Sequence, residues 1–522
     1  MGQPSTQASN AIIYLSYGAF LVVGCYIAWR LRHQTKGEYL SGNRTQTAFP
    51  LALNFIASAL GSGILFSYPQ LATITGVQGT VIYAITSAAP LMIFAYLGPI
   101  IRAKCPEGFV LTEWTRQRYG VVTAIYISFL TCATMFLYMV AELSALQQIM
   151  NALTGMNGLP MVIVECVVTT IYTYNIQGAM VIGLIIIATV TIGVETKIDK
   201  SLIPSSGLTD ASLLGWQLLY ILPVAVLTND FFLSNFWIRT FASKTDKDLW
   251  IGVSIATVVT LVILTLVGST GFIAVWSGAF DPNNPDQDGS VAFFYLLEQL
   301  PAWTVGIVLV MVVSLSTAAF DSFQSAMVST ASNDLFRNKL NIWWIRGAVV
   351  AIIFPVVVLA LKAPSILQIY LISDLFSASS IPVLVLGLSD RFYWWRGFEV
   401  VVGGFGGILT VFIFGTIYFG NAQDGANLIL LENGLYGNDW SAFGAFVAAP
   451  FGGLLWGLAA FAARITYQFA YAKLKGERFD ALDRPVYLDR RVEGQPEYAD
   501  STEIHSDSRE GIVTVDHKGK FF

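Results

Sequence analysis

One segment, from Phe49 to Gly76, is long and apolar enough to cross a lipid bilayer but contains residues that favour a break in a helix. Asn54 and Ser58 are polar, and a Gly-Ser-Gly run at residues 61–63 follows them. Inside a bilayer, backbone groups that leave a helix are tolerated only where they face protein or line a wet cavity. The segment therefore predicts a broken helix beside a binding site for a solute or an ion, which is typical of a transporter rather than a membrane anchor.

The composition of the chain indicates a protein with many membrane spans. Of its 522 residues, 55% are hydrophobic and 12% are charged, whereas about a quarter of the residues of a typical soluble domain are charged. The three histidines lie outside the apolar segments, which excludes a histidine-based metal or acid–base site in the membrane. The four cysteines have no spacing typical of a disulfide framework or a metal site.

The apolar segments predict an all-α membrane protein. Because about 20 apolar residues make one crossing, we expect about thirteen membrane helices. The predicted spans lie near residues 12–31, 50–75, 80–101, 121–149, 158–173, 178–194, 214–237, 250–276, 302–331, 343–361, 364–388, 398–419 and 442–466.

Lysine and arginine residues concentrate in alternate loops. One set of loops contains most of them, whereas the loops of the other set contain only Lys197, Lys200 and Lys362. Cytoplasmic loops of membrane proteins are enriched in Lys and Arg, so the first set is predicted to be cytoplasmic. This assignment places the N-terminus outside a multi-pass plasma-membrane protein and the tail, residues 471–522, in the cytoplasm. The charged, aliphatic-poor composition of the tail predicts disorder.

Five short motifs stand out along the chain. They are Gly37–Arg44 ahead of the broken segment, Pro106–Gly120, Ile171–Thr173, Trp237–Lys244 and the Ser/Thr-rich span that ends at Asn333–Phe336. In order and spacing these motifs resemble those of the sodium:solute symporter family, over about residues 12–466. Within that family, the overall sequence is most similar to the urea active transporter branch.

The resemblance implies a LeuT-type fold, in which two five-helix repeats of inverted topology surround a site at the middle of the membrane. Two further helices would follow the repeats. The implied division is residues 1–49 for the N-terminal end and the first extra helix, 50–194 and 195–390 for the two repeats, 391–470 for the two additional helices and 471–522 for the tail.

The resemblance also implies a site for a coupling sodium ion between the broken helix and the ninth span. The matching positions are Ala57 and Leu60 for backbone carbonyl ligands and Ser316 and Thr317 for hydroxyl ligands. Oxygen ligands of this kind suit a hard cation. A gap-free alignment instead puts two alanines, residues 318–319, at the hydroxyl positions. The alternative is therefore that the two hydroxyls bond only to their own helix.

Ionisable side chains are costly inside a bilayer, so each is a candidate functional group. Asp321 is a candidate ion relay, whereas Glu165 and Asp374 are interpreted as structural carboxylates that pair with neighbouring polar groups. Glu142 lies four residues after Tyr138 and therefore shares its helix face. The predicted substrate-binding set is Asn54, Ser58, Ser62, Tyr68, Tyr138, Glu142 and Asp230.

Residues 173–178 depart from the family pattern. The family has a Gly-Gly turn followed by Thr-Asp-x-x-Gln, whereas here Thr173 continues directly into Tyr174-Asn175-Ile176-Gln177-Gly178. A missed exon and a true deletion both explain the shortened turn. A true deletion is expected to impair ion release toward the cytoplasm.

Together these features favour a secondary active symporter that imports a small polar solute. No G-x-x-x-x-G-K-(S/T) loop for ATP is present, so a sodium or proton gradient is expected to drive transport. Enzymatic activity, a cofactor and a nucleic-acid partner are not expected. Urea is the first choice of substrate. Proline or another amino acid, a polyamine, and a sensor that does not transport are the alternatives.

Overall fold

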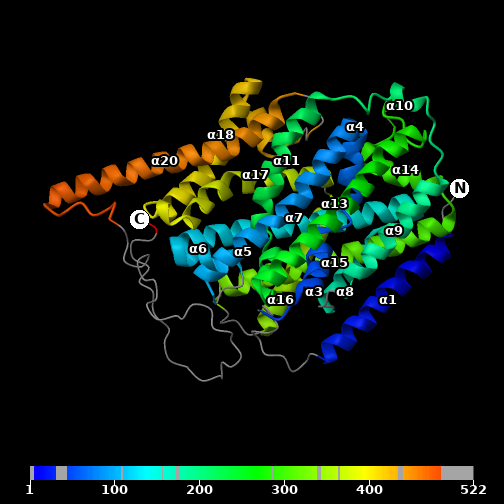
Figure 1. Ribbon diagram of the computed structural model, residues 1–522, viewed down its shortest axis with the longest axis horizontal. Helices are drawn as coiled ribbons and strands as arrows, with labels where there is room; N and C mark the ends of the chain where they lie inside the picture. Colours follow the sequence, from blue (N-terminus) through cyan, green and yellow to red (C-terminus); the bar gives the residue numbers. More distant parts are fainter. Residues whose placement is uncertain are drawn as a thin grey trace.

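The computed structural model is helical throughout the part of the chain that it describes, apart from one isolated β-bridge between Gln46 and Ser243. The helices form a bundle, with α1 (Thr6–Arg30) along one side and α20 (Ser441–Lys475) projecting at the other (Figure 1). The described residues are 5–30, 44–106, 110–155, 157–171, 177–284, 286–334, 336–337, 342–362, 365–432, 435, 439–483 and 521.

Long helices alternate with short ones along the chain. The first half contains α3 (Ala48–Ala59), α4 (Ile64–Ala88), η1 (Ala89–Leu91), α5 (Met92–Lys104), α6 (Leu111–Tyr119), α7 (Val121–Thr154), α8 (Leu159–Ile171), α9 (Gln177–Glu195), α10 (Leu202–Ser205), α11 (Leu213–Phe232), α12 (Ser234–Ala242) and α13 (Asp246–Trp276). The second half contains η2 (Gly289–Val291), α14 (Ala292–Glu298), α15 (Ala302–Asp334), α16 (Ile342–Ala360), α17 (Ile366–Val385), η3 (Leu386–Leu388), η4 (Asp390–Phe392), α18 (Gly397–Phe419) and α19 (Ala422–Ile429), followed by α20.

The predicted break in the first core helix is confirmed. α3 ends at Ala59 and α4 begins at Ile64, with Leu60 between them in an extended conformation (φ −112°, ψ 110°). Every residue from 60 to 73 is buried. Because water cannot reach the freed backbone groups, other parts of the protein must supply their hydrogen-bond partners.

α4 turns back on itself at Gly76, so its two halves belong to two successive predicted spans. Gly76 has φ 60° and ψ −147°, and a Cβ at this position would lie 1.8 Å from the carbonyl oxygen of Leu208. The rings of Tyr68 and Tyr83, on either side of the turn, stack with centroids 3.9 Å apart. A straight helix would separate these two residues by about 22 Å. Glycine is therefore required at this turn.

A second broken helix is formed by α11 and α12. Leu233 interrupts it with φ −78° and ψ 89°. The indole nitrogen of Trp237 donates a 3.0 Å hydrogen bond to the carbonyl oxygen of Phe231, which supplies a partner for one acceptor at this break. α12 packs against α3 and α15, so the short halves of the two broken helices lie together.

The membrane spans agree with the sequence prediction. By length and composition, nine helical stretches among the described residues can cross a membrane. One of them, Ile64–Lys104, has 41 residues and contains the turn at Gly76, so it includes parts of two predicted spans. Shorter apolar helices, including α3, α8 and α9, lie within further predicted spans. Each of the roughly thirteen predicted spans coincides with at least part of a helix.

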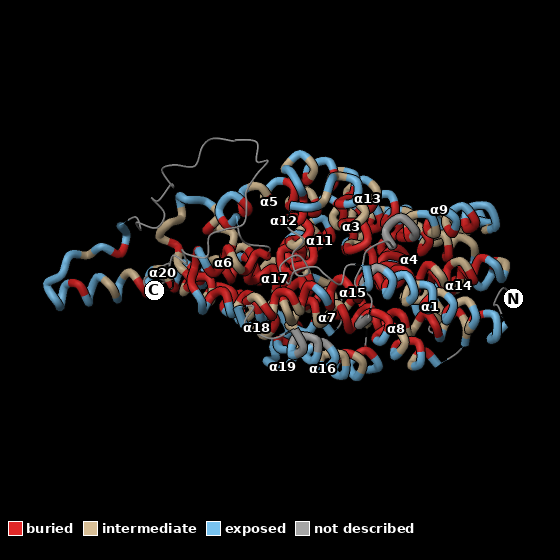
Figure 2. Tube along the Cα trace, turned by 90° about the horizontal axis from the view of Figure 1, so that it is seen from below, coloured by how far each residue is buried: buried red, intermediate tan, exposed pale blue. Residues whose placement is uncertain are grey.

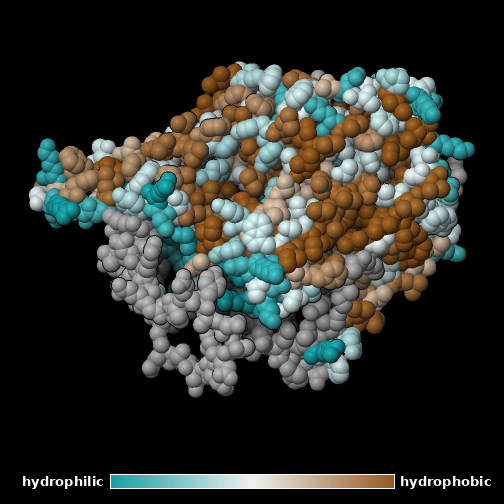
Figure 3. Space-filling model, viewed as in Figure 1, coloured by the Kyte–Doolittle hydropathy of each residue, from teal (hydrophilic) through white to brown (hydrophobic). Residues whose placement is uncertain are grey.

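The periphery of the bundle is apolar. α9, for example, exposes the side chains of Ile186, Ile187, Val190 and Val194. Buried residues concentrate inside the bundle (Figure 2), while hydrophobic residues cover much of the face shown in Figure 3. An apolar surface of this extent is typical of contact with lipid. The fold is therefore that of an all-helical polytopic membrane protein.

Loops predicted to share one side of the membrane contact one another. Arg102 pairs with Asp246 at 3.1 Å, and Lys104 pairs with Asp390 at 2.8 Å. These contacts join the end of α5 to the start of α13 and to η4, three places where the Lys/Arg pattern predicts a cytoplasmic loop. The three loops therefore lie at one end of the molecule, and the assignment of that end to the cytoplasm stays a prediction.

Several features of the sequence analysis fall partly outside the described residues. They are residues 37–43 of the first motif, 107–109 of the second, 172–176 of the third motif and the shortened turn, 335 of the last motif and 484–520 of the tail. α20 continues to Lys475, so helix extends past residue 471, where the tail was expected to start. The proposed repeat boundaries stay predictions.

A fully buried ion pair joins α18 to α20. The Nε of Arg464 lies 2.6 Å from Oε1 of Glu399, and both side chains are 0% exposed. The second carboxylate oxygen accepts a 3.0 Å hydrogen bond from the backbone N–H of Arg396. Arg464 also donates a 2.8 Å hydrogen bond to the carbonyl oxygen of Trp394.

We expect Arg464→Met to lower the free energy of unfolding by about 3–5 kcal/mol, because it leaves the Glu399 carboxylate buried without its partner. The double variant Arg464→Met with Glu399→Met should recover most of this loss, since two apolar side chains can replace a buried pair. Arg478→Met, in an exposed pair with Asp483, should change stability by about 0–1 kcal/mol. Unfolding of the purified protein measures all three, and equal losses in the single and double variants would contradict the prediction.

Candidate functional site

A cavity of about 120 Å³ lies between the two broken helices. Gly61 and Leu233, one at each break, both line it. The broken helices therefore place their interruptions at the same cavity, together with side chains from the helices packed around them. The polar and aromatic lining residues are Ser58, Ser67, Tyr68, Tyr83, Ser87, Tyr138, Glu142, Asn229, Asp230, Phe236, Thr260, Phe323, Tyr370 and Asp374.

Glu142, on α7, holds the break between α3 and α4. Its Oε2 accepts hydrogen bonds from the backbone N–H of Ser62 at 2.7 Å and from the hydroxyl of Ser62 at 2.8 Å. Its Oε1 accepts a 3.2 Å hydrogen bond from the hydroxyl of Tyr370. A Cβ at Gly61 would lie 2.0 Å from the same Oε1, so only glycine allows this approach. A carboxylate beside the first residues of α4 also interacts favourably with the helix dipole.

Asp230 and Asp374 place two further carboxylates at the cavity. Asp230 lies at the end of α11 beside the second break, and its Oδ2 is buried without a hydrogen-bond partner. Asp374, on α17, is close enough for the two negative charges to interact unfavourably. Among the lining residues that the structure describes there is no Lys, Arg or His. Three carboxyl groups therefore line the cavity, without a basic side chain among its described lining residues.

Aromatic rings form much of the remaining wall. Tyr68 and Tyr83 stack on one another, and the Tyr138 ring lies 4.8 Å from Tyr370 and 5.3 Å from Phe323, measured between centroids. The side-chain amide of Asn229 donates a hydrogen bond to the Tyr138 hydroxyl. The faces of such rings attract ammonium groups, and their edges pack well against methylene chains.

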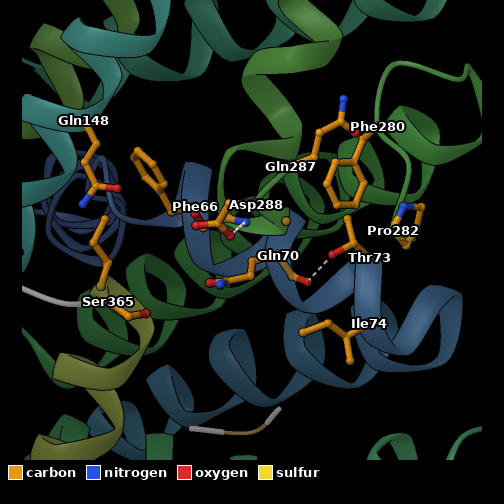
Figure 4. Close-up of a pocket in the computed structure, with 13 residues that line it drawn as sticks. Phe66, Gln70, Thr73, Ile74, Gln148, Phe280, Pro282, Gln287, Asp288 and Ser365 are labelled. Carbon is orange, nitrogen blue, oxygen red and sulfur yellow. Dashed lines mark hydrogen bonds between the residues drawn. The ribbon is translucent and has the colours of Figure 1, made fainter. Parts of the chain in front are cut away.

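A larger cavity, of about 560 Å³, adjoins α4 and the start of α17 (Figure 4). Phe66 and Gln70 from α4, Gln148 from α7, and the loop that contains Gln287 and Asp288 surround it. On α17, the lining of the larger cavity includes Ile366, and the lining of the smaller one includes Tyr370, one turn further along. The two cavities therefore lie about one helical turn apart along α17.

The structure brings some of the predicted substrate residues to the cavity and leaves others away from it. Ser58, Tyr68, Tyr138, Glu142 and Asp230 line it. The prediction of a shared cavity face for Tyr138 and Glu142 agrees with this arrangement. Their role as substrate ligands stays a prediction.

Asn54 and Ser62 have other surroundings. The hydroxyl of Ser62 donates a hydrogen bond to Glu142. Asn54 lies about one turn before Ser58 on α3, and its backbone carbonyl oxygen accepts a 3.0 Å hydrogen bond from Arg239. Arg239 also donates to the hydroxyl of Ser322 at 3.1 Å, so it links α12 to both α3 and α15. Asp321, the predicted ion relay, is buried near this arginine, and their opposite charges interact.

The predicted sodium ligands occupy two helices that pack together, α3 and α15. Ala57 and Leu60 are buried at the end of α3, and Ser316 and Thr317 are 0% exposed on α15. The hydroxyl of Thr317 donates to its own helix, at 2.7 Å from the carbonyl oxygen of Val313, and lies 3.1 Å from Oε2 of Glu165. Coordination of one ion by the four predicted residues stays a prediction.

Sequence reasoning missed part of the cavity. Asp374 was interpreted as structural, yet it lines the cavity together with Tyr83, Asn229 and Tyr370. A signal for Asp374 was available, because Tyr370 precedes it by four residues, which is the same spacing as Tyr138 and Glu142. Tyr83 had no such signal, since only the turn at Gly76 brings it beside Tyr68.

Comparison with known proteins identifies one relative over nearly the whole chain. The chain is 53% identical over 527 residues to the spermidine transporter DUR31 of Candida albicans, an alignment that covers 98% of this chain and 100% of the relative. No family model matches the chain.

Solved structures show the same fold at low sequence identity. A Na⁺-coupled sialic acid symporter in a substrate-bound, outward-open state matches with a TM-score of 0.65 and 13% identity, over 86% of this chain and 98% of the other. Mhp1, a nucleobase-cation-symport-1 family transporter in a closed conformation, matches with a TM-score of 0.54 and 14% identity, over 83% and 96%. These likenesses support the LeuT-type fold. The chain therefore belongs to the same transporter family as the Candida albicans spermidine transporter DUR31 and is not an enzyme.

Proposed function

We propose that this protein imports polyamines of the spermidine class across the plasma membrane, driven by a cation gradient and by the membrane potential. The observation that carries the proposal is the cavity between the broken helices, where Glu142, Asp230 and Asp374 meet without a basic residue in the described lining. Buried carboxylates of this kind need a cationic partner.

The chemistry of a polyamine matches this lining. A spermidine molecule at neutral pH carries protonated amines separated by short methylene chains. Asp230 and Asp374 offer carboxylate acceptors for ammonium groups, and hydrogen bonds between charged groups are stronger than neutral ones. The rings of Tyr68, Tyr83 and Tyr138 supply faces for ammonium groups and apolar surface for the chains between them.

The three carboxylates have different proposed roles. Both oxygens of Glu142 already accept hydrogen bonds from the protein, so this residue chiefly holds the break in shape. Asp230 has a buried oxygen without a partner and is the first candidate for a direct contact with the substrate. Asp374 faces the same cavity and is the second candidate.

This lining favours the polyamine alternative of the sequence analysis over urea, its first choice. Urea is neutral and gains nothing from three carboxylates beyond hydrogen bonds. The 53% identical relative is a spermidine transporter, which points to the same substrate class.

Inward transport of a polyvalent cation has a favourable electrical term at an inside-negative membrane potential. Each elementary charge that moves inward across about 100 mV of inside-negative potential contributes about 2.3 kcal/mol. A coupling ion, sodium or proton, adds to this force. The structural likeness to a Na⁺-coupled symporter supports the general scheme and leaves the choice of ion open.

Uptake of labelled spermidine in cells that lack their own polyamine transporters tests the proposal. We expect saturable accumulation above the outside concentration, competition by other polyamines, and no competition by urea or proline. Replacement of sodium by choline, and separately a change of outside pH, identifies the coupling ion. Accumulation of urea without accumulation of spermidine would refute the proposed substrate, and equilibration without concentration would indicate a channel.

Asp230→Asn and Asp374→Asn should each raise the KM for spermidine by about tenfold or more, since each removes a charge worth at least about 1.4 kcal/mol to a bound ammonium group. Asp210→Asn, on the exposed loop ahead of α11, is the matched control and should leave KM unchanged. Initial uptake rates at varied spermidine concentration, corrected for the amount of protein at the cell surface, give the values. Wild-type KM in both cavity variants would place the polyamine elsewhere.

Glu142→Ala should lower stability and turnover rather than affinity alone. Removal of this carboxylate leaves the buried N–H of Ser62 and the hydroxyl of Tyr370 without acceptors, at a cost of about 1–3 kcal/mol each. Glu142→Gln retains an oxygen acceptor and should be intermediate. Thermal unfolding of purified protein, together with kcat from uptake, checks this order. A variant with normal stability and a raised KM would instead make Glu142 a substrate ligand.

A further inference from the structure

Glu165, on α8, is a buried carboxylate outside the lining of the central cavity. Its side chain lies between α15, which carries Ser316 and Thr317, and α1, which carries Tyr17. All four residues are at most 2% exposed. The group therefore brings a negative charge and three hydroxyl oxygens together in a place shielded from water and lipid.

The oxygen atoms of this group are incompletely bonded. Oε2 of Glu165 lies 3.1 Å from the hydroxyl of Thr317, whose shorter hydrogen bond, at 2.7 Å, goes to the carbonyl oxygen of Val313. Oε1 of Glu165, the hydroxyl of Ser316 and the phenolic hydroxyl of Tyr17 are buried and make no hydrogen bond of normal geometry, although both hydroxyls lie close enough to Glu165 to interact with it. Buried polar atoms are almost always paired in native proteins. A ligand that contacts the carboxylate and both hydroxyls would complete their bonding.

The charge of Glu165 also lacks a counter-ion. None of the four ion pairs in the described part of the chain includes it. The nearby acidic residues Glu142 and Asp321 add to the negative potential rather than offset it. Burial disfavours the charged form of this carboxylate, so it needs either a bound proton or a bound cation.

We propose that Glu165, Tyr17, Ser316 and Thr317 form a binding site for a monovalent cation, with sodium as the ion that fits its oxygen ligands. A hard cation takes oxygen donors, and one carboxylate with three hydroxyls supplies four of them. A single positive charge neutralises the single carboxylate. The site differs from the one implied by the family resemblance, because α8 and α1 supply ligands in place of the carbonyl groups of Ala57 and Leu60.

The inference rests on the proposed cation-driven transport and gives it a specific site. α15 packs against α3, the first half of the broken helix, and also against α8 and α1. An ion bound here holds α8, α15 and α1 together next to the helix that is interrupted at the substrate cavity. α1, which lies outside the two predicted repeats, thereby acquires a direct role in ion binding.

The experiment measures thermal unfolding of the purified full-length protein in lipid nanodiscs, without polyamine. Sodium chloride replaces choline chloride at constant total salt. A ligand that binds the folded state raises its stability as concentration increases. We expect a saturable rise in Tm with sodium. The half-effect concentration is the sodium concentration that gives half of the maximal rise in Tm. Glu165→Gln should raise it by about tenfold to a hundredfold, and Tyr17→Phe should raise it by about tenfold.

Tyr17→Phe removes only one hydroxyl and keeps the ring packed. If Glu165→Gln does not fold, the sodium response of Tyr17→Phe therefore tests the proposed ion site. Asp230→Asn is the matched control and should keep the stabilisation by sodium. In a parallel series with spermidine added, it should lose the stabilisation by spermidine that the wild type shows. If spermidine fails to stabilise the wild type and sodium still acts through Glu165, the proposed substrate is wrong and the ion site stands. No sodium effect beyond that of choline, or an unchanged half-effect concentration in both site variants, overturns the inference.

Discussion

The contact between the Glu142 carboxylate and the backbone N–H of Ser62 is the interaction on which the rest of the structure depends. A helix interrupted inside a membrane exposes backbone donors that neither lipid nor bulk water can satisfy. Glu142 accepts from the freed N–H group at 2.7 Å and from the hydroxyl of the same serine at 2.8 Å. The absence of a side chain at Gly61 lets the carboxylate approach this closely. The break is thereby a stable element of the fold.

The buried carboxylates fall into two groups. Some are hydrogen-bonded or paired within the protein, and others have an oxygen atom without a protein partner. Glu142 is fully engaged by Ser62 and Tyr370, and Glu399 by Arg464. Asp230, by contrast, has a buried oxygen without a partner. Because an unpaired buried charge is costly, its persistence at a cavity is most simply explained by a ligand that completes it during function. This distinction rests on geometry, and the number of acidic residues in the spans would not reveal it.

Much of the fold could be predicted from local pattern. The apolar spans, the break after Ala59 and the loops that share one end all follow from hydropathy, glycine placement and charge, which depend on neighbouring residues. The roles of the site residues stay predictions. Ser62, a predicted substrate residue, bonds to Glu142, and Asp374, interpreted as structural, lines the cavity. Which face of a helix meets a cavity depends on how distant helices pack, which the pattern within one span does not specify.

The sequence by itself determined that the chain is a membrane protein with a broken core helix and acidic residues inside its spans, because hydrophobic length and the cost of buried charge act on each segment separately. Only the tertiary structure decided that Asp230 and Asp374 share one cavity with a stacked Tyr68–Tyr83 pair, and that Glu165 meets hydroxyl groups from α1 and α15. Those contacts join residues far apart along the chain, and the packing of the helices brings them together.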